Sequence, residues 1–288
     1  MIIDCHYHLD PRVQPLGNLL SKMEENGTDK TAIMPTMCDP IPHNPEFLLK
    51  VMRFLLAHPS LQGLVKRLTA NFTQDGDLNL PKSVLKIYKS PDNSQIAEAI
   101  AAHPDKFMGW IFVNPRGPIN PVEELSKWQS QEGFIGIKAH PFWHQYPPEE
   151  LMPVAEKAVE FGMPLLIHAG FDGHGEFMPL INNLPELKLV LAHAGFPGFY
   201  QTWKLIKNYP NIHVDLSADA YINMRLTRDV VEFLGEDRCL FGTDGPYGET
   251  ANDGWFHNGK IKRRIEALFS SETTRRKILG ENFSKLIS

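Results

Sequence analysis

Short apolar runs along this chain repeatedly end in a histidine, a lysine or an aspartate. The pattern occurs in five segments, residues 4–8, 136–140, 166–170, 191–195 and 241–246. A buried β-strand looks like this when its C-terminal end delivers one polar side chain into a site. Because helix-sized intervals separate the segments, we expect parallel strands whose carboxyl ends meet at one place.

The spacing of these strand ends is regular in the second half of the chain. Successive intervals from Lys138 to His168, His193, Ser217 and Asp244 are 30, 25, 24 and 27 residues. One strand, one helix and two loops of a βα unit occupy about this length. Apolar runs bounded by turn residues predict eight strands, at residues 1–5, 31–36, 107–113, 134–138, 164–168, 187–193, 212–217 and 238–243.

Helical periodicity fills the intervals between these strands. It predicts helices at residues 16–26, 45–57, 94–102, 122–131, 148–161 and 227–234, and a closing helix from about residue 271. Eight alternating strands and helices close most simply into a parallel (β/α)8 TIM barrel, an α/β fold, and 288 residues suit one such domain over 1–288. The long stretch 38–106, between strands 2 and 3, also shows apolar periodicity near 61–68, and we expect it to be an insertion that caps the site.

The alternative architecture is an open, doubly wound sheet. That fold calls for a glycine-rich phosphate-binding turn after its first strand. Here the corresponding position holds His-Tyr-His-Leu-Asp-Pro, so the barrel is the favoured interpretation.

Composition narrows the classes of partner. The net charge is −5 and no Lys/Arg-rich run occurs, which argues against nucleic acid and anionic membranes. No uncharged run reaches membrane-spanning length, and polar residues interrupt any N-terminal apolar stretch. Three widely spaced cysteines do not suggest a disulfide framework. We therefore expect a cytoplasmic protein with a small-molecule substrate, and homo-oligomerisation stays open.

The first strand carries a closely spaced pair of histidines. Side chains two apart on a strand point the same way, so Asp4, His6 and His8 are expected to face the barrel axis, and Cys5 and Tyr7 the helices. Two imidazoles about 7 Å apart along a strand can converge on one ion where the strand bends. The pair predicts a metal site at the barrel mouth.

Two later strands share a second pattern, in which an apolar run leads into His-Ala-Gly. His168 and His193 occupy these positions, one βα unit apart. The glycine after each lets the chain turn sharply. Two such histidines on adjacent strands are expected to share one centre.

Asp244 ends the eighth strand within Phe-Gly-Thr-Asp-Gly-Pro. A carboxylate there can bind a metal ion and also take a proton from water that the ion has acidified. The flanking glycines and Pro246 are typical of a special loop rather than of a plain helix cap. We expect Asp244 to act as ligand, general base and later general acid.

The fourth strand ends in Lys138 and His140, which share one face. Lys138 has two functional interpretations: it is carbamylated and bridges two metal ions, or it stays a free cation that holds an anionic substrate. His140, Arg116 and His174 are candidate substrate contacts. Weaker polar candidates are Asn114, Asp215, Ser217 and Asp219, and the histidines interpreted as surface or structural are His43, His58, His103, His144, His213 and His257.

These motifs resemble the amidohydrolase superfamily, specifically the amidohydrolase-related branch that includes aminocarboxymuconate-semialdehyde decarboxylase-like enzymes. The resemblance runs from Asp4-Cys5-His6-Tyr7-His8 through Gly136-Ile137-Lys138-Ala139-His140-Pro141 to the region of Asn282. The ordered set of strand-end ligands is specific to the superfamily and not to a substrate.

The resemblance implies a role for each strand-end residue. His6 and His8 match the first-strand metal pair, and His168 and Asp244 the fifth- and eighth-strand ligands. His193 matches the sixth-strand residue, which polarises substrate or positions water in one-metal members and binds the second ion in two-metal members. Lys138 stands where two-metal members carry a carbamylated lysine, so a divalent ion, Zn²⁺ first, is expected as one ion or two, with one favoured.

The expected reaction is hydrolysis, in which activated water attacks an amide, ester or lactone carbonyl of a small carboxylated substrate. Asp244 and His193 would be the catalytic residues. Two alternatives stay open: metal-dependent non-oxidative decarboxylation on the same scaffold, and a barrel that binds a ligand without catalysis.

Overall fold

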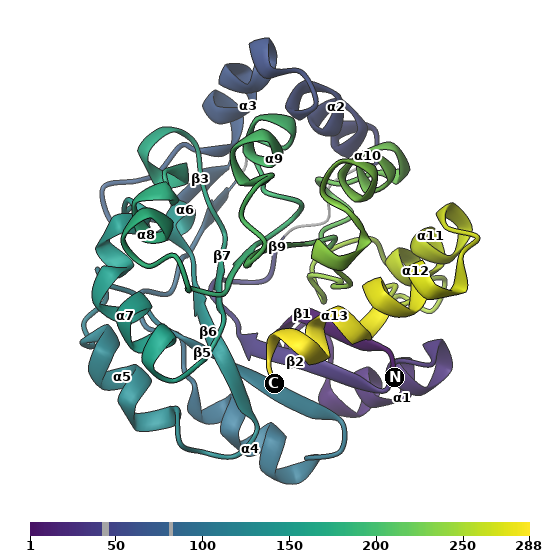
Figure 1. Cartoon of the computed structure of the whole chain (residues 1–288), viewed down its shortest axis with the longest axis horizontal. Helices are drawn as coiled ribbons and strands as arrows, with labels where there is room; N and C mark the ends of the chain where they lie inside the picture. Colours follow the sequence, from purple (N-terminus) through teal and green to yellow (C-terminus); the bar gives the residue numbers. More distant parts are fainter. Residues whose placement is uncertain (42–45, 81–82) are drawn as a thin grey trace.

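The computed structural model describes residues 1–41, 46–80 and 83–288, and its centre is a sheet of eight parallel strands (Figure 1). Their order around the sheet is β1-β2-β5-β6-β7-β8-β9-β10, which is also their order along the chain. The two edges of the sheet meet, because the Cys5 amide donates to the Phe241 carbonyl at 2.9 Å and the His8 amide to that of Gly245 at 2.6 Å. The predicted (β/α)8 barrel is confirmed, and the open sheet is excluded.

The barrel strands lie where the apolar runs predict them. Their bounds are β1 (Ile3–Leu9), β2 (Lys30–Pro35), β5 (Phe107–Phe112), β6 (Phe134–Ala139), β7 (Leu165–Ile167), β8 (Leu189–Leu191), β9 (Ile212–Asp215) and β10 (Cys239–Leu240). The first is longer than expected and the last much shorter. β10 ends early because the Thr243 amide donates to the Asp4 carboxylate at 2.9 Å rather than to a strand carbonyl.

Helices alternate with these strands on the outside of the barrel (Figure 1). They are α1 (Leu16–Asn26), α4 (Ser94–Ala102), α5 (Pro121–Trp128), α6 (Pro141–His144), α7 (Met152–Glu160), α8 (Met178–Asn183), α9 (Tyr200–Ile206), α10 (Met224–Leu234) and α11 (Lys260–Leu268). Short 3₁₀ turns are η2 (Pro148–Leu151), η3 (Asp172–Gly175) and η4 (Glu236–Arg238). The predicted closing helix consists of α12 (Glu272–Arg276), a π-helical turn η5 (Lys277–Glu281) and α13 (Asn282–Leu286).

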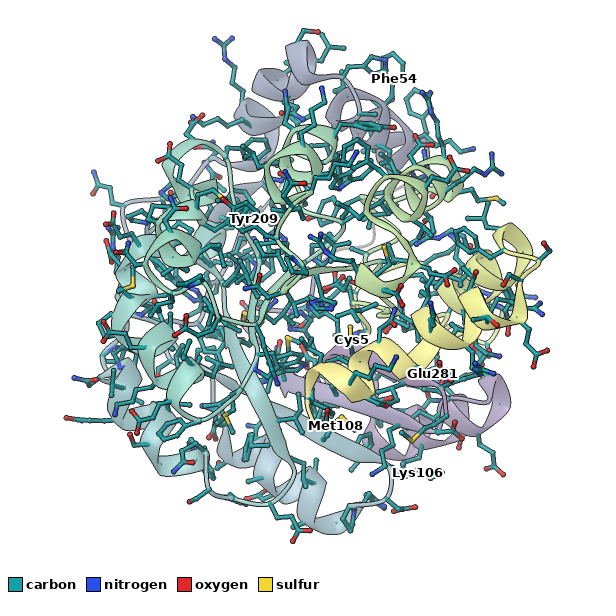
Figure 2. The ribbon with its side chains drawn as sticks, viewed as in Figure 1. Cys5, Phe54, Lys106, Met108, Tyr209 and Glu281 are labelled. Carbon is teal, nitrogen blue, oxygen red and sulfur yellow. The ribbon has the colours of Figure 1, made fainter. Side chains whose placement is uncertain are left out.

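Apolar side chains form one core between strands and helices and a smaller one inside the barrel. The inner core includes Cys5 and Trp110, and Phe283 of α13 closes it, with its ring 5.8 Å from that of Trp110. The expected outward direction of Cys5 is therefore wrong, although Tyr7 does belong to the outer core. A register shift between Asp4 and Tyr7 explains this, because a bulge breaks the two-residue alternation. Figure 2 shows Cys5 near the centre of the molecule.

Between β2 and α4, the described part of the insertion contains two α-helices and a pair of antiparallel strands. Its elements are α2 (Glu46–Leu56), η1 (Pro59–Leu61), α3 (Gln62–Thr69) and the antiparallel strands β3 (Leu78–Leu80) and β4 (Ser83–Leu85). The helices match the periodicity at 45–57 and 61–68, whereas three-residue strands are too short to show a pattern. The Arg53 guanidinium donates to the Asp219 carbonyl at 2.7 Å, and the Gln62 amide to that of Pro197 at 2.9 Å. The insertion thus contacts the loops that follow β8 and β9.

Within the part of the chain that the structure describes, the helices lack the length and apolar character needed to cross a bilayer. The three cysteines, Cys5, Cys38 and Cys239, are buried and unpaired.

Candidate metal centre

Three predicted ligands from opposite ends of the sequence meet at the barrel mouth. The Nε2 atoms of His6 and His8 each lie 3.3 Å from the same Asp244 oxygen, Oδ1. β1 supplies the two histidines, and the loop after β10 supplies the aspartate. His6 and His8 share one face of β1, as residues two apart on a strand do, and their ring centroids are 5.4 Å apart.

The spacing of these atoms suits a divalent ion. Zinc ligands at about 2.0–2.1 Å in a tetrahedron lie about 3.4 Å from one another, close to the observed separations. Burial, and then the nearby Lys138 charge, hold the pKa of His6 well below its ordinary value, so the ring is neutral and has a free lone pair. His8 Nδ1 is buried without a hydrogen-bond partner among the described residues. The donor set fits a metal such as zinc, whereas the unpartnered nitrogen has no role that we can assign.

Asp215, at the end of β9, orients two of the site histidines. Its Oδ2 lies 2.9 Å from His6 Nδ1, and its Oδ1 accepts hydrogen bonds from the Ser217 hydroxyl and from the His193 backbone amide. The His193 ring is held in turn, because its Nδ1 lies 2.8 Å from Ser217 Oγ. Since the Ser217 hydroxyl donates to Asp215, its oxygen accepts from His193. Both rings therefore carry their proton on Nδ1 and present an Nε2 lone pair to the site.

His193 lies between this network and Asp244. Its Nε2 is 3.9 Å from Asp244 Oδ2, and its ring stacks on His6 at 5.1 Å between centroids. The backbone reaches this position through a left-handed turn at His193 and Ala194, each with φ of 53°, and at Gly195, with φ of 75°. The glycine expected to let the chain turn here does so at positive φ.

His168 lies at the border of the cluster and belongs to neither of the two compact groups of possible ligand atoms. Its ring centroid is 4.7 Å from that of His193, and its Nδ1 lies 2.9 Å from the Ala169 carbonyl. Burial lowers the pKa of His168 to about 3, so this ring is also neutral. The compact groups of possible ligand atoms are His6, His8 and Asp244, and His6, His193 and Asp215. The role of His168 as a ligand stays a prediction.

Lys138 is completely buried beneath the histidines. Its Nζ lies 3.4 Å from His6 Nε2, and among the described residues no carboxylate oxygen comes within ion-pair distance of it. Burial lowers the pKa of Lys138 to about 8, against the opposing effect of Asp215 and Asp244. A lysine with this pKa is partly neutral near physiological pH, the state that reacts with carbon dioxide. Both interpretations of Lys138 therefore stay open.

Asp244 is the least buried member of the cluster, with 16 % of its side chain exposed. Its backbone adopts φ of 62°, and its amide donates to the His6 carbonyl at 2.8 Å. Burial raises the pKa of Asp244, which favours exchange of a proton. A Cβ on the following Gly245 would come within 2.3 Å of the Tyr7 ring, so this loop depends on a glycine. Asp4 stays below, accepting from the Thr243 amide and hydroxyl, and its pKa is raised by burial to about 7.

Of the predicted substrate contacts, Lys138 and His140 lie directly against site histidines. His140 stacks on the His168 ring at 4.2 Å, so it borders the site. Arg116 pairs with Glu150 and donates to the Gln145 carbonyl. His174 lies in η3, and its carbonyl accepts from the amide of Gly170, two residues after His168, at 2.9 Å. Contact of these side chains with a substrate stays a prediction.

An aromatic wall surrounds the histidines, and the sequence patterns do not reveal it. Ring centroids of Phe196, Tyr221 and Tyr247 lie 5.3, 5.4 and 5.5 Å from His168, His193 and His8, respectively. These residues come from loops whose packing is set only in the folded barrel. The histidines treated as structural include His144, whose ring nitrogens contact two carbonyls, whereas His43 lies outside the described residues.

One cavity is lined by residues other than these ligands. It has a volume of about 370 Å³ and lies between α3 and the loops after β7 and β8, with Lys66, Gly170, Phe196 and Thr202 in its lining. Because Ala169 and Phe196 are in its lining, this cavity lies beside His168 of the cluster.

Known proteins share the sequence pattern and the fold of this chain. A family model described as amidohydrolase matches residues 3–286. No curated protein sequence matches. Three solved structures share the fold at TM-scores of 0.62, 0.63 and 0.59: 4-oxalomesaconate hydratase from Rhodopseudomonas palustris, 2,6-dihydroxybenzoate decarboxylase from Rhizobium and 5-carboxyvanillate decarboxylase from Sphingomonas paucimobilis.

Their sequence identities to this chain are 20 %, 16 % and 15 %, respectively. The alignments cover 100 %, 99 % and 99 % of this chain and 95 %, 98 % and 98 % of the three structures. At such identities the likeness concerns the fold, while the family match spans nearly the whole sequence. The chain belongs to the amidohydrolase family.

Proposed function

We propose that the protein is a metal-dependent hydrolase acting on a carbonyl group of a small, carboxylated substrate. The observation that carries the proposal is the position of Asp244, which shares one carboxylate oxygen with two histidine nitrogens while its side chain stays partly accessible. A carboxylate so placed can ligate an ion and transfer a proton within the same site.

His6, His8, His168 and Asp244 would hold the ion. A bound divalent ion, Zn²⁺ by the nitrogen and oxygen donor set, supplies Lewis-acid chemistry that lowers the pKa of water and polarises a carbonyl. Asp244 takes the proton of the attacking water and returns it to the leaving group. His193 assists as an acceptor through its Nε2 lone pair, because its Nδ1 proton is engaged by Ser217.

Substrate binding would use the residues around this centre. His140 borders His168, and Lys138, if it stays a free amine, would offer a positive charge to a substrate carboxylate. The insertion of residues 38–106 would serve as a cap, since Arg53 and Gln62 already contact the loops around the site.

Non-oxidative decarboxylation is the second candidate, and the aromatic wall favours it. Phe196, Tyr221 and Tyr247 offer flat surfaces suited to an aromatic or unsaturated acid. Two of the similar structures are decarboxylases of aromatic acids. In this reaction a site residue would protonate the ring carbon as carbon dioxide leaves.

Product analysis separates the two reactions. The purified protein is loaded with zinc or manganese and given panels of amides, esters, lactones and aromatic carboxylic acids in ¹⁸O-labelled water. Hydrolysis places one ¹⁸O atom in the product, whereas release of carbon dioxide without ¹⁸O in the organic product would refute it. Asp244→Asn is the matched variant, and full activity in it would refute the role of Asp244 in either reaction.

The number of ions is tested by metal content and intact mass together. One ion per chain and an unmodified Lys138 support the mononuclear site that we favour. Two ions with one added carboxyl group on Lys138 would establish the binuclear alternative. Absence of affinity for zinc and manganese would support a non-catalytic binding protein instead.

A further inference from the structure

One helix of the insertion exposes an uncharged apolar stripe. α2 places Phe47, Leu48, Val51 and Phe54 at the surface, with exposed fractions of 73 %, 52 %, 39 % and 57 %. Figure 2 shows Phe54 at the outer edge of the molecule, and Figure 1 shows α2 projecting beside α3. Scattered apolar residues are ordinary on a surface, but a continuous stripe on one helix is a mark of an interaction site.

The opposite face of α2 is already used. Arg53 and Leu56 are buried, and the Arg53 guanidinium contacts the Asp219 carbonyl of the barrel. At about 100° per residue, the exposed apolar side chains and the partly buried Leu55 span an arc of about 120° on the other side. Two charged residues, Glu46 and Lys50, lie outside this arc. Among the described residues of its own chain, the stripe is covered only in part: the His58 ring lies 4.4 Å from that of Phe54, and Leu55 packs against the core, whereas Phe47, Leu48, Val51 and Phe54 stay exposed.

We propose that this stripe is the interface of a homodimer, in which α2 packs antiparallel against α2 of a second copy. The order of the side chains carries the proposal, because the stripe is close to palindromic about Val51. Reversal of the helix about this residue exchanges Leu48 with Phe54 and Phe47 with Leu55. A two-fold axis through Val51 would therefore place each apolar side chain against another apolar one, as an isologous interface requires.

The area of the stripe is sufficient for such a dimer. The four exposed residues offer on the order of 400 Å² of apolar surface, most of it from the two phenylalanines. A two-fold contact buries this area on both copies, about 800 Å² in total. Because about two thirds of a homodimer interface is apolar, this corresponds to roughly 1,200 Å² overall, the lower edge of the range for stable interfaces.

Sedimentation tests the dimer directly. We expect the full-length protein to sediment at twice its chain mass of 32.7 kDa at micromolar concentration. Val51→Glu should shift it to the monomer mass, because two carboxylates would meet at the axis. Ile119→Glu changes an equally exposed residue before α5, away from the insertion, and should leave the dimer intact. A wild-type monomer at 100 µM, or a dimer that survives Val51→Glu, would overturn the proposal.

A cross-linking variant tests the position of the axis. The native cysteines are buried, so Val51→Cys introduces the single accessible thiol of the chain. Copper-phenanthroline oxidation should join two Val51→Cys chains through one disulfide, whereas Ile119→Cys should stay monomeric on a non-reducing gel. Equal cross-linking of both variants would refute the axis. Binding of the wild-type monomer to phosphatidylcholine vesicles would instead assign the stripe to a lipid surface.

Discussion

The hydrogen bonds around Asp215 lead us to predict how far the substitution Asp215→Asn weakens metal binding. Four donors converge on this buried carboxylate: the ring of His6, the amide and hydroxyl of Ser217, and the amide of His193. Asp215→Asn keeps the size of the side chain but replaces one accepting oxygen with an NH₂ donor. The lower-cost orientation keeps the oxygen toward Ser217 and His193, which turns the NH₂ group toward His6 Nδ1.

That orientation changes the tautomer of His6. Two donors cannot face each other, so the ring proton would move from Nδ1 to Nε2, the atom that lies 3.3 Å from Asp244. A hydrogen bond to a charged group is worth about 1.5–3 kcal/mol, and each 1.4 kcal/mol is a factor of ten. We therefore expect Asp215→Asn to weaken zinc binding roughly 10- to 100-fold, in the range seen when a residue that orients a metal-ligating histidine is lost.

Competition with a chromophoric zinc chelator measures this affinity without depending on turnover. Nitrogen NMR of labelled histidine reports the His6 tautomer, a signature that a general loss of stability would not produce. Ser217→Ala is the control, because it removes the support of His193 but leaves the 2.9 Å contact between Asp215 and His6. We expect Ser217→Ala to bind zinc within about threefold of wild type, well under one tenfold step of 1.4 kcal/mol. Wild-type affinity and an unchanged His6 tautomer in Asp215→Asn would refute the reasoning.

Three further substitutions probe Asp244, Lys138 and the packing of the barrel. Asp244→Ala should lower the turnover number by about 10²–10⁴-fold, the usual contribution of a general acid–base group. An unchanged turnover number in steady-state kinetics would show that Asp244 has no part in the reaction. Because burial lowers the pKa of Lys138 from 10.5 to about 8, the unfolded chain binds more protons between these values, so the unfolding free energy of the metal-free protein should rise with pH there. Over this pH range the unfolding free energy of the wild type should rise by about 3 kcal/mol more than that of Lys138→Met, as measured by urea unfolding. Parallel plots of unfolding free energy against pH for the two proteins would contradict this prediction. Gly136→Ala should destabilise the barrel by about 1–3 kcal/mol, since its Cβ would lie 2.5 Å from Trp110, whereas Gly17→Ala in open space on α1 should be neutral or stabilising, and equal melting temperatures would oppose this account.

The barrel was predictable because its signals are local. Apolar runs of strand length, helical periodicity and regular spacing each occupy one short window of sequence, and their order alone fixes the parallel sheet. The same locality places His6, His8, His193 and Asp244 at strand ends. Local patterns in the sequence therefore identify the residues that project into the site.

The contacts between those residues were not predictable in the same way. Asp215 could be placed at a strand end, but not beside His6, because β1 and β9 are not neighbours in the sheet and the two residues are 209 positions apart. The inward turn of Cys5 depends on a bulge, which the two-residue alternation cannot anticipate. The aromatic wall, with Tyr221 as one member, comes from loops that are ordered only by tertiary packing.

The proton positions of the network leave donor atoms that could hold a cation. Asp215 and Ser217 hold the Nδ1 protons of His6 and His193, so both Nε2 lone pairs point toward Asp244, at 3.3 and 3.9 Å. An ionised Asp244 would then face two acceptors, and the nearest cationic group is Lys138, whose Nζ lies 3.4 Å from His6 Nε2. A metal ion satisfies all three groups at once, whereas a proton can satisfy one pair only. The network around Asp215 thus turns both Nε2 lone pairs inward, while burial, with the nearby Asp215 charge adding to it, raises the pKa of Asp244.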